Sequence, residues 1–386
     1  MSCFRVYAAF AVIVAIVASA PAAKAQGCVV ARSNGEIGGP ASQGGYLAPG
    51  EFDLGIGYRH QYSFRHFIGP AEQKQRIAMG NEVENKINLE NLSLTYQMTR
   101  RFSVTANLPV LTASRHTNNT DVFQLSDGVG DTSFLASGWL WNPTENTRGN
   151  VQLGIGFEIP TGQDNVTTLE NGSKGPTTVT NDYSIQPGSG GYGIVFQWAS
   201  YKNVKSTQLY FNGSYLATPQ NTNNVLRSAT AASQPLTQYN SISDQYLLEA
   251  GIAVPFPKVP GLTLTFGPRF EGVPANDLIG DSLGFRRPGF ALSVEPGVQY
   301  YRGGSTFVFS VAAATYRDRT KSAPDVILGT HGDAAFADYV WLASYSYRFD
   351  PFHRHQHAMA PKPGQSPAKA ELRSVQSPVA SESACS

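Results

Sequence analysis

Charged residues are scarce in this sequence: Asp, Glu, Lys and Arg make up only 15% of its 386 residues, and the net charge is +1. A chain this close to neutral lacks the basic surface that nucleic-acid binding needs. Its mean hydropathy of −0.22 is too low for a bundle of membrane helices. The 41% hydrophobic and 11% aromatic residues nevertheless bury enough apolar surface to exclude a disordered chain. With 38 glycines, the composition favours an all-β protein.

Cysteine is also scarce, with three residues at positions 3, 28 and 385. The first lies within a predicted signal peptide, residues 1–25, in which Arg5 precedes an apolar run at 6–18. Ala23 and Ala25 match the small residues of a cleavage site. After export, Cys28 and Cys385 could form a disulfide or remain two unpaired thiols.

Alternation of apolar with polar residues dominates the chain beyond residue 50. In residues 51–66, Leu54, Ile56 and Tyr58 share one face, while Asp53 and Arg59 share the other. A period of two indicates a β-strand with one apolar face. The same pattern recurs to give twelve predicted strands, near 51–66, 92–98, 102–110, 130–141, 151–159, 192–198, 209–215, 246–254, 262–270, 290–300, 307–311 and 339–349.

Short and long connections alternate between these segments. The long polar connections are predicted at residues 67–86, 111–128, 161–188, 217–243, 274–285 and 317–337. This asymmetry is typical of bacterial outer-membrane barrels, which have short periplasmic turns and long extracellular loops. The predicted fold is therefore all-β, an antiparallel up-and-down transmembrane barrel of about twelve strands. Its edges close on each other because hydrocarbon offers no hydrogen bonds to an open sheet edge.

The predicted organisation has four parts. A signal peptide (1–25) precedes a periplasmic N-terminal segment (26–50), the outer-membrane barrel covers 51–349, and a disordered, Pro/Ala/Ser-rich periplasmic tail covers 350–386. The predicted location is the outer membrane of a Gram-negative bacterium. The expected partners are outer-membrane lipid, a small-molecule solute and the barrel-assembly machinery, with no nucleic acid.

Charged residues on the polar strand faces are the candidate lumen lining. They are Glu51, Asp53, Arg59, Arg65, Glu158, Glu249, Arg269, Glu271, Arg287, Glu295 and Arg348. Acids and bases are mixed, so no field of one sign is evident. Two interpretations stay open: the opposed charges shape a constriction that orients solutes, or they pair across a plugged interior and stabilise the barrel.

Catalytic signatures are weak. His60, His66 and His116 fall near the predicted outer rim, with Ser63 and Ser114 nearby in sequence, but no spacing specifies a triad. We therefore expect no enzymatic activity, cofactor or metal site, and keep a membrane hydrolase as the lesser alternative.

Three glycine-rich stretches resemble a known family. They are GVGD at residues 128–131, GIGFEIPTG at 154–162 and PGSGG at 187–191. Together they are similar to the outer-membrane β-barrel family named after the meta-pathway of phenol degradation, and the likeness spans residues 51–349. It implies a transporter-like barrel, in some members associated with uptake of aromatic or other hydrophobic compounds. In such barrels the last strand ends in an aromatic residue at the C-terminus, which serves as the assembly signal. This sequence departs from that pattern, because it continues to residue 386 beyond the aromatic Phe349 of the last strand.

The leading functional hypothesis is an outer-membrane channel for passive uptake of small solutes, including aromatic and hydrophobic ones. The alternative is a non-conducting surface barrel that acts as a receptor or adhesin.

Overall fold

Twelve long strands account for most of the computed structural model, which describes residues 46–118, 120, 122–172, 175–227 and 233–351. They are β1 (Phe52–Ile68), β3 (Val83–Gln97), β4 (Phe102–Thr117), β6 (Thr132–Trp139), β7 (Gly149–Ile159), β10 (Gly193–Val204), β11 (Thr207–Ala217), β14 (Gln245–Pro255), β15 (Leu262–Val273), β16 (Gly289–Arg302), β17 (Ser305–Asp318) and β18 (Ala334–Phe349). The predicted signal peptide, Cys28, Cys385 and nearly all of the predicted tail lie outside the described residues.

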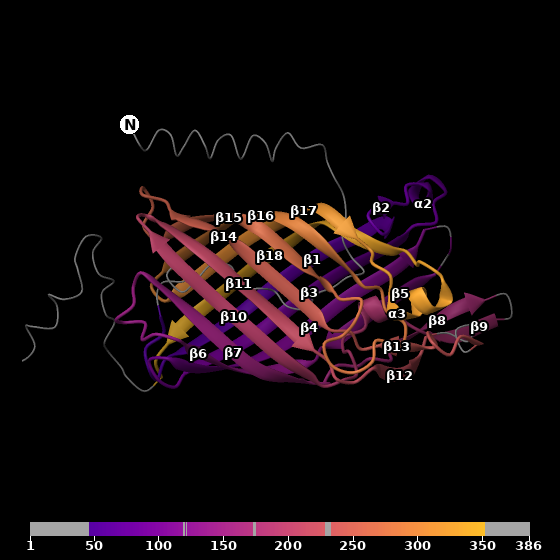
Figure 1. The fold of residues 1–386 in the computed structure, drawn as a ribbon, viewed down its shortest axis with the longest axis horizontal. Helices are drawn as coiled ribbons and strands as arrows, with labels where there is room; N and C mark the ends of the chain where they lie inside the picture. Colours follow the sequence, from indigo (N-terminus) through magenta and orange to yellow (C-terminus); the bar gives the residue numbers. More distant parts are fainter. Residues whose placement is uncertain (1–45, 119, 121, 173–174, 228–232, 352–386) are drawn as a thin grey trace, which may run out of the picture. The chain divides into compact units, whose positions relative to one another are not determined.

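The sheet closes on itself. Each long strand pairs antiparallel with the next, and β1 also pairs with β18, from Phe52 opposite Phe349 to Phe67 opposite Ala334. The strands lie side by side at a tilt around the barrel (Figure 1). The predicted closed antiparallel barrel of twelve strands is confirmed. No helix among the described residues is long and apolar enough to cross a membrane.

The wall has an apolar outer face and a polar inner face. On β1, the side chains of Leu54 and Ile56 are 51% and 46% exposed, whereas Arg59 and Gln61 are buried inside. Phe307 and Trp341 are likewise exposed on the outer faces of β17 and β18. An apolar surface that would be unfavourable in water is the one that hydrocarbon requires.

This facing inverts along β3. Leu92 and Leu94 point outward and are exposed, but Ile87 and Leu89 point inward and are buried. The outward positions between and beside them, such as Lys86, carry polar side chains. The pattern of apolar residues outside and polar residues inside therefore ends on β3 between residues 90 and 91, whereas β5 keeps Phe123 and Leu125 exposed on its outer face.

The connection predicted at residues 111–128 is instead mostly strand. β4 continues to Thr117 and pairs with β5 (Phe123–Val129), which extends the wall beyond β6. Leu111 and Ala113 face inward here, so the pattern of a lipid-facing strand is reversed. The prediction of a loop was wrong because it assumed apolar residues outside and polar residues inside along the whole strand.

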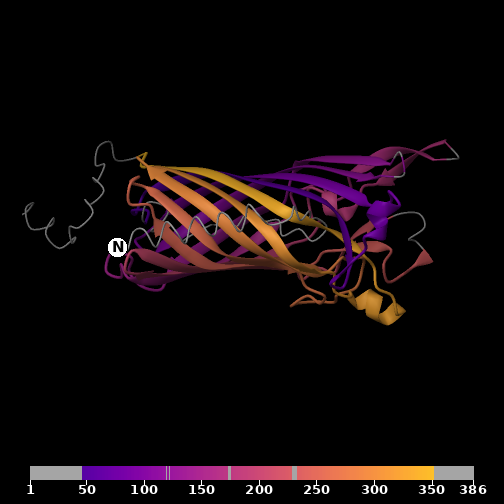
Figure 2. The same cartoon turned by 90° about the horizontal axis from the view of Figure 1, so that it is seen from above.

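The other long connections contain small elements of their own. These are β2 (Ala71–Glu72), α2 (Gln75–Ala78), β8 (Thr167–Gly172), β9 (Gly175–Thr180), η1 (Tyr183–Ile185), β12 (Thr222–Leu226), β13 (Tyr239–Ser241) and α3 (Ala323–Leu328). They gather at one end of the barrel, hereafter the long-loop end (Figures 1 and 2). The opposite end, where short turns join the strands, is the short-turn end.

The register of the seam between β1 and β18 is open to a direct test. Tyr58 lies opposite Ala343, so Tyr58→Cys with Ala343→Cys should form a disulfide, since directly opposed Cβ atoms lie about 4.5–5.5 Å apart. Non-reducing electrophoresis and thiol titration would detect it in a Cys28→Ser, Cys385→Ser background. Tyr58→Cys with Tyr347→Cys, displaced by four residues, should stay unlinked. Equal cross-linking of both pairs would contradict the closed register.

Candidate functional site

Five buried charged side chains meet inside the barrel, and we call them the central ion cluster: Arg59, Glu249, Arg269, Glu271 and Glu295. Arg59 Nη2 lies 2.7 Å from Glu271 Oε1, and Arg269 Nη2 lies 2.8 Å from Glu271 Oε2. Arg269 also pairs with Glu249, and its Nη1 lies 3.5 Å from Glu295. Every member is at most 5% exposed, so each charge depends on the others for compensation.

The cluster crosses the lumen. Arg59 is on β1 and Glu271 is on β15, and β16, β17 and β18 lie between them in the sheet order. Two side chains from such distant strands can touch only across a chord of the barrel. Gln61 Oε1 accepts from Arg59, and the Ser310 hydroxyl donates to Glu295 at 2.6 Å. The network therefore occupies part of the cross-section and narrows the lumen at its level.

A second narrowing lies at the long-loop end, where the chain between β9 and β10 folds inward. Ile185 of η1 is fully buried against four inward-facing residues of β3 and β4, namely Ile87, Leu89, Leu111 and Ala113. The inverted apolar patch of the wall thus serves as a seat for η1, and burial of this cluster favours the inward position. We call η1 and this seat the loop plug.

Asp182, the N-cap of η1, ties the loop plug to both sides of the mouth. Its side chain accepts from the Ser184 backbone N–H and receives two bonds from Arg287, at 2.8 and 2.7 Å. Arg115 Nη2 of β4 lies 3.5 Å from its Oδ2. Burial alone would raise the pKa of Asp182, but the Arg115 and Arg287 guanidinium groups hold that pKa well below its ordinary range.

The three glycine-rich stretches converge at Asp131. Its two carboxylate oxygens accept from the backbone N–H groups of Gly162, at 3.0 Å, and Ser189, at 2.6 Å. Thr161 Oγ1 also donates to Gly130 O at 2.8 Å. A Cβ on Gly188 would lie 2.3 Å from Gly162 O, so this close approach requires glycine. The junction anchors the base of the loop that carries η1.

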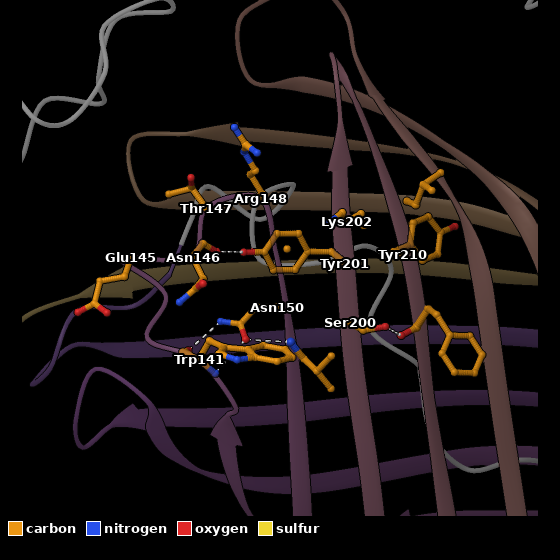
Figure 3. Close-up of a pocket in the computed structure, with 14 residues that line it drawn as sticks. Trp141, Glu145, Asn146, Thr147, Arg148, Asn150, Ser200, Tyr201, Lys202 and Tyr210 are labelled. Carbon is orange, nitrogen blue, oxygen red and sulfur yellow. Dashed lines mark hydrogen bonds between the residues drawn. The ribbon is translucent and has the colours of Figure 1, made fainter.

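Aromatic side chains gather at the short-turn end. Tyr46, which precedes β1, packs edge-on against Trp139 with ring centroids 5.1 Å apart, and its hydroxyl meets that of Tyr201. Tyr201 reaches toward Asn146 in the turn between β6 and β7, with its hydroxyl 3.5 Å from Asn146 O (Figure 3). A cavity of about 660 Å³ lies beside this turn.

A cavity of about 380 Å³, with both polar and apolar lining, lies inside the barrel. It reaches from Tyr46 and Trp139 to Glu249 of the central ion cluster and to Asp131. Hydroxyl and amide side chains supply much of its lining, among them Asn91, Ser93, Thr95, Gln97, Ser103, Thr105, Asn107, Ser133, Ser137, Gln152, Gln197, Asn212, Ser214, Gln245, Thr306, Ser344 and Ser346. Such a surface can exchange hydrogen bonds with water and with polar groups of a solute.

The remaining charged residues predicted from the sequence lie in three places. Asp53 and Arg348 line the cavity and pair across the β1–β18 seam at 3.3 Å, and Glu158 also lines the cavity. Arg65 pairs with Glu72 at 2.5 Å and Asp338 at 3.0 Å near the long-loop end. Glu51 accepts from the Ala48 backbone N–H at the short-turn end.

Sequence reasoning missed Asp182, Arg115 and Tyr46. The first two fall in segments predicted as solvated loops, and Tyr46 falls in a segment expected to lie in the periplasm outside the barrel. The capping pattern of Asp182 before a short turn was the one available signal.

Two of the three histidines considered for hydrolysis, His60 and His66, have other polar partners. His66 Nδ1 lies 2.8 Å from Asp333 Oδ2, and its Nε2 accepts from the Val83 backbone N–H at 2.9 Å. With both ring nitrogens engaged, His66 presents no base to a serine. His60 Nδ1 lies 2.8 Å from Asn88 Oδ1.

No family model matches the sequence, and no curated protein matches it. Among solved structures, an outer membrane channel from Pseudomonas putida F1 has a TM-score of 0.54 at 12% identity, with 79% of this chain and 97% of that chain covered. The translocator domain of the autotransporter NalP from Neisseria meningitidis has a TM-score of 0.43 at 13% identity, with 80% and 92% covered. The P. putida toluene transporter TodX has a TM-score of 0.38 at 11% identity, with 83% and 94% covered. At these identities the likeness is one of fold.

Glu271→Gln should destabilise the barrel, because it leaves Arg59 and Arg269 buried without the carboxylate that they share. Breaking a buried ion pair in this way costs about 3–5 kcal/mol. Chemical unfolding in detergent, followed by heat-modifiable electrophoretic mobility, measures the change. Glu145→Gln, in an exposed turn, should stay within about 0.5 kcal/mol of wild type. Equal stability of both variants would contradict the role of the cluster.

Proposed function

We propose that this chain is an outer-membrane channel for passive uptake of small solutes, including aromatic and other hydrophobic compounds. One observation carries the proposal: a cavity of about 380 Å³, lined by hydroxyl and amide side chains and also by apolar ones, lies inside a closed barrel whose outer face is apolar. An interior built only for stability would be filled by interdigitated side chains. The lumen lining would comprise the cavity residues together with the central ion cluster.

The boundaries of the cavity are suited to selection. The central ion cluster reaches the cavity at Glu249 and carries both charge signs, and Tyr46 and Trp139 line the cavity at the short-turn end. The loop plug forms a separate narrowing at the long-loop end. A solute that enters therefore passes both polar and apolar groups. This combination suits small molecules with an apolar body and a polar handle.

The family resemblance and the channel fold support the location and the solute class. The three motifs of the resemblance meet at Asp131, which gives their glycines a shared structural purpose in this chain. We propose membership of the family named after phenol degradation, an outer-membrane location after signal-peptide export, the long-loop end outside the cell, and contact with outer-membrane lipid and the assembly machinery.

Reconstitution into planar bilayers tests the proposal. The folded, purified protein should give discrete single-channel currents, and liposomes that contain it should admit small aromatic solutes faster than empty liposomes. A boiled sample, which has lost the barrel, serves as the control. Neither current nor solute flux from a heat-modifiable, correctly folded sample would overturn the proposal.

Asp182→Asn should loosen the loop plug and raise the conductance. The ion pair between Asp182 and Arg287 is partly exposed, so we expect its loss to cost the closed position of the loop plug about 1–2 kcal/mol. That free energy shifts the ratio of open to closed channels roughly five- to thirtyfold. Single-channel recording measures the change, and Asp281→Asn, an exposed acid at the same end, should leave it unaltered. A decrease or no change would contradict the role of Asp182.

The pH dependence of closure has a defined direction. Because the pKa of Asp182 is depressed in the folded loop, its contribution to closure is complete above the ordinary aspartate value and is lost as pH falls through the lowered pKa. Conductance should therefore stay constant from pH 8 to about 4 and rise only below that. In Asp182→Asn this acid response should be smaller.

A surface receptor is the second candidate, favoured by the β8–β9 and β12–β13 hairpins at the long-loop end (Figure 1). Deletion of residues 167–180 removes the first hairpin but keeps Asp182, Ile185 and the Asp131 junction. If the barrel is a receptor or adhesin, this deletion should abolish cell-surface binding while leaving solute permeability unchanged.

A further inference from the structure

Three arginine side chains converge around one aromatic ring and one acid at the long-loop end. Arg287, which precedes β16, pairs with Asp182, and its guanidinium carbon lies 4.7 Å from the centroid of Phe285. Arg227, which follows β12, stacks on the same ring with its guanidinium carbon 3.5 Å from the centroid. Arg115 completes the group through Asp182. We call these five residues the arginine mouth.

The arginine mouth carries more positive than negative charge. Its three guanidinium groups face one carboxylate, that of Asp182, which Arg287 and Arg115 already share. Arg227 is the sole charged residue between positions 206 and 243, and residues 228–232 are Ser, Ala, Thr, Ala and Ala. No carboxylate pairs with Arg227 within the described part of the chain; its Nη1 lies 3.4 Å from Thr237 O.

The electrostatics of Arg227 show the same imbalance. Burial lowers its pKa most, the positive charges of Arg287 and Arg115 lower it further, and Asp182 opposes them. Holding like charges close together at a half-buried site is unfavourable unless an anion offsets them. A guanidinium group offers planar, forked N–H donors that match a carboxylate.

We propose that the arginine mouth binds the carboxylate of small organic anions at the channel entrance, with Arg227 as the principal contact. The Phe285 ring places an apolar group directly beside the cations, so an aromatic carboxylate fits better than an inorganic anion. This inference rests on the proposed channel function and deepens it by naming a solute class. It also gives the entrance a charge preference that the mixed lumen lining lacks.

Calorimetric titration of benzoate into the folded protein in detergent tests the site without relying on transport. Benzoate should bind, and benzyl alcohol and benzylamine, which lack the carboxylate, should bind more weakly. Arg227→Gln should weaken benzoate binding on the order of tenfold or more, as loss of a charge-assisted contact does. Lys321→Gln removes the same charge from an exposed position at the same end and should bind as wild type does. Inorganic phosphate should bind less tightly than benzoate.

Arg227→Lys is the control for misfolding, because it keeps the positive charge of Arg227 but loses the forked N–H donors of the guanidinium group. It should retain part of the affinity while showing wild-type heat-modifiable mobility. Equal affinity of wild type for benzoate and benzyl alcohol, or unchanged benzoate affinity in folded Arg227→Gln, would overturn the inference. Conductance without benzoate binding would overturn this site and leave the channel standing, whereas benzoate binding without conductance would overturn the channel.

Discussion

The hydrogen bonding of the backbone is the constraint on which the rest of this structure depends. A sheet in hydrocarbon cannot leave an edge unpaired, since each unsatisfied group costs several kcal/mol. The pairing of β1 with β18 removes both edges at once and turns the sheet into a wall with an inside. Once the wall is closed, the inside is the place for polar side chains, because the outside must be apolar.

Polar groups inside such a wall need partners, and the barrel supplies them in two ways. Small hydroxyl and amide side chains line a cavity, where water and solutes can meet them. The larger charges form the central ion cluster, in which Arg59 and Arg269 share Glu271. These charges pair across the interior and, because they span it, they narrow the lumen at their level.

Closure at the long-loop end follows a different physical rule. At this end β3 and β4 turn apolar residues inward and offer a seat for Ile185. Asp182 then fastens the inward loop to arginines on opposite sides of the mouth. Hydrogen bonds from Asn181 to Leu125 O and Ser126 Oγ of β5 hold the same loop against the wall.

The sequence by itself determined the number of strands, their approximate places and the inward facing of Arg59, Glu249, Arg269, Glu271 and Glu295. A period of two is a local property, and the length of the connections is written along the chain. The same reasoning failed at residues 111–128, because the facing of β4 reverses there and places Leu111 and Ala113 inside the barrel. Only the tertiary structure decided which charges pair across the lumen, where Asp182, Arg115 and Tyr46 lie, and which three motifs meet at Asp131. These contacts depend on strand tilt and stagger around the closed barrel and on loops without periodicity, and neither leaves a trace in local sequence pattern.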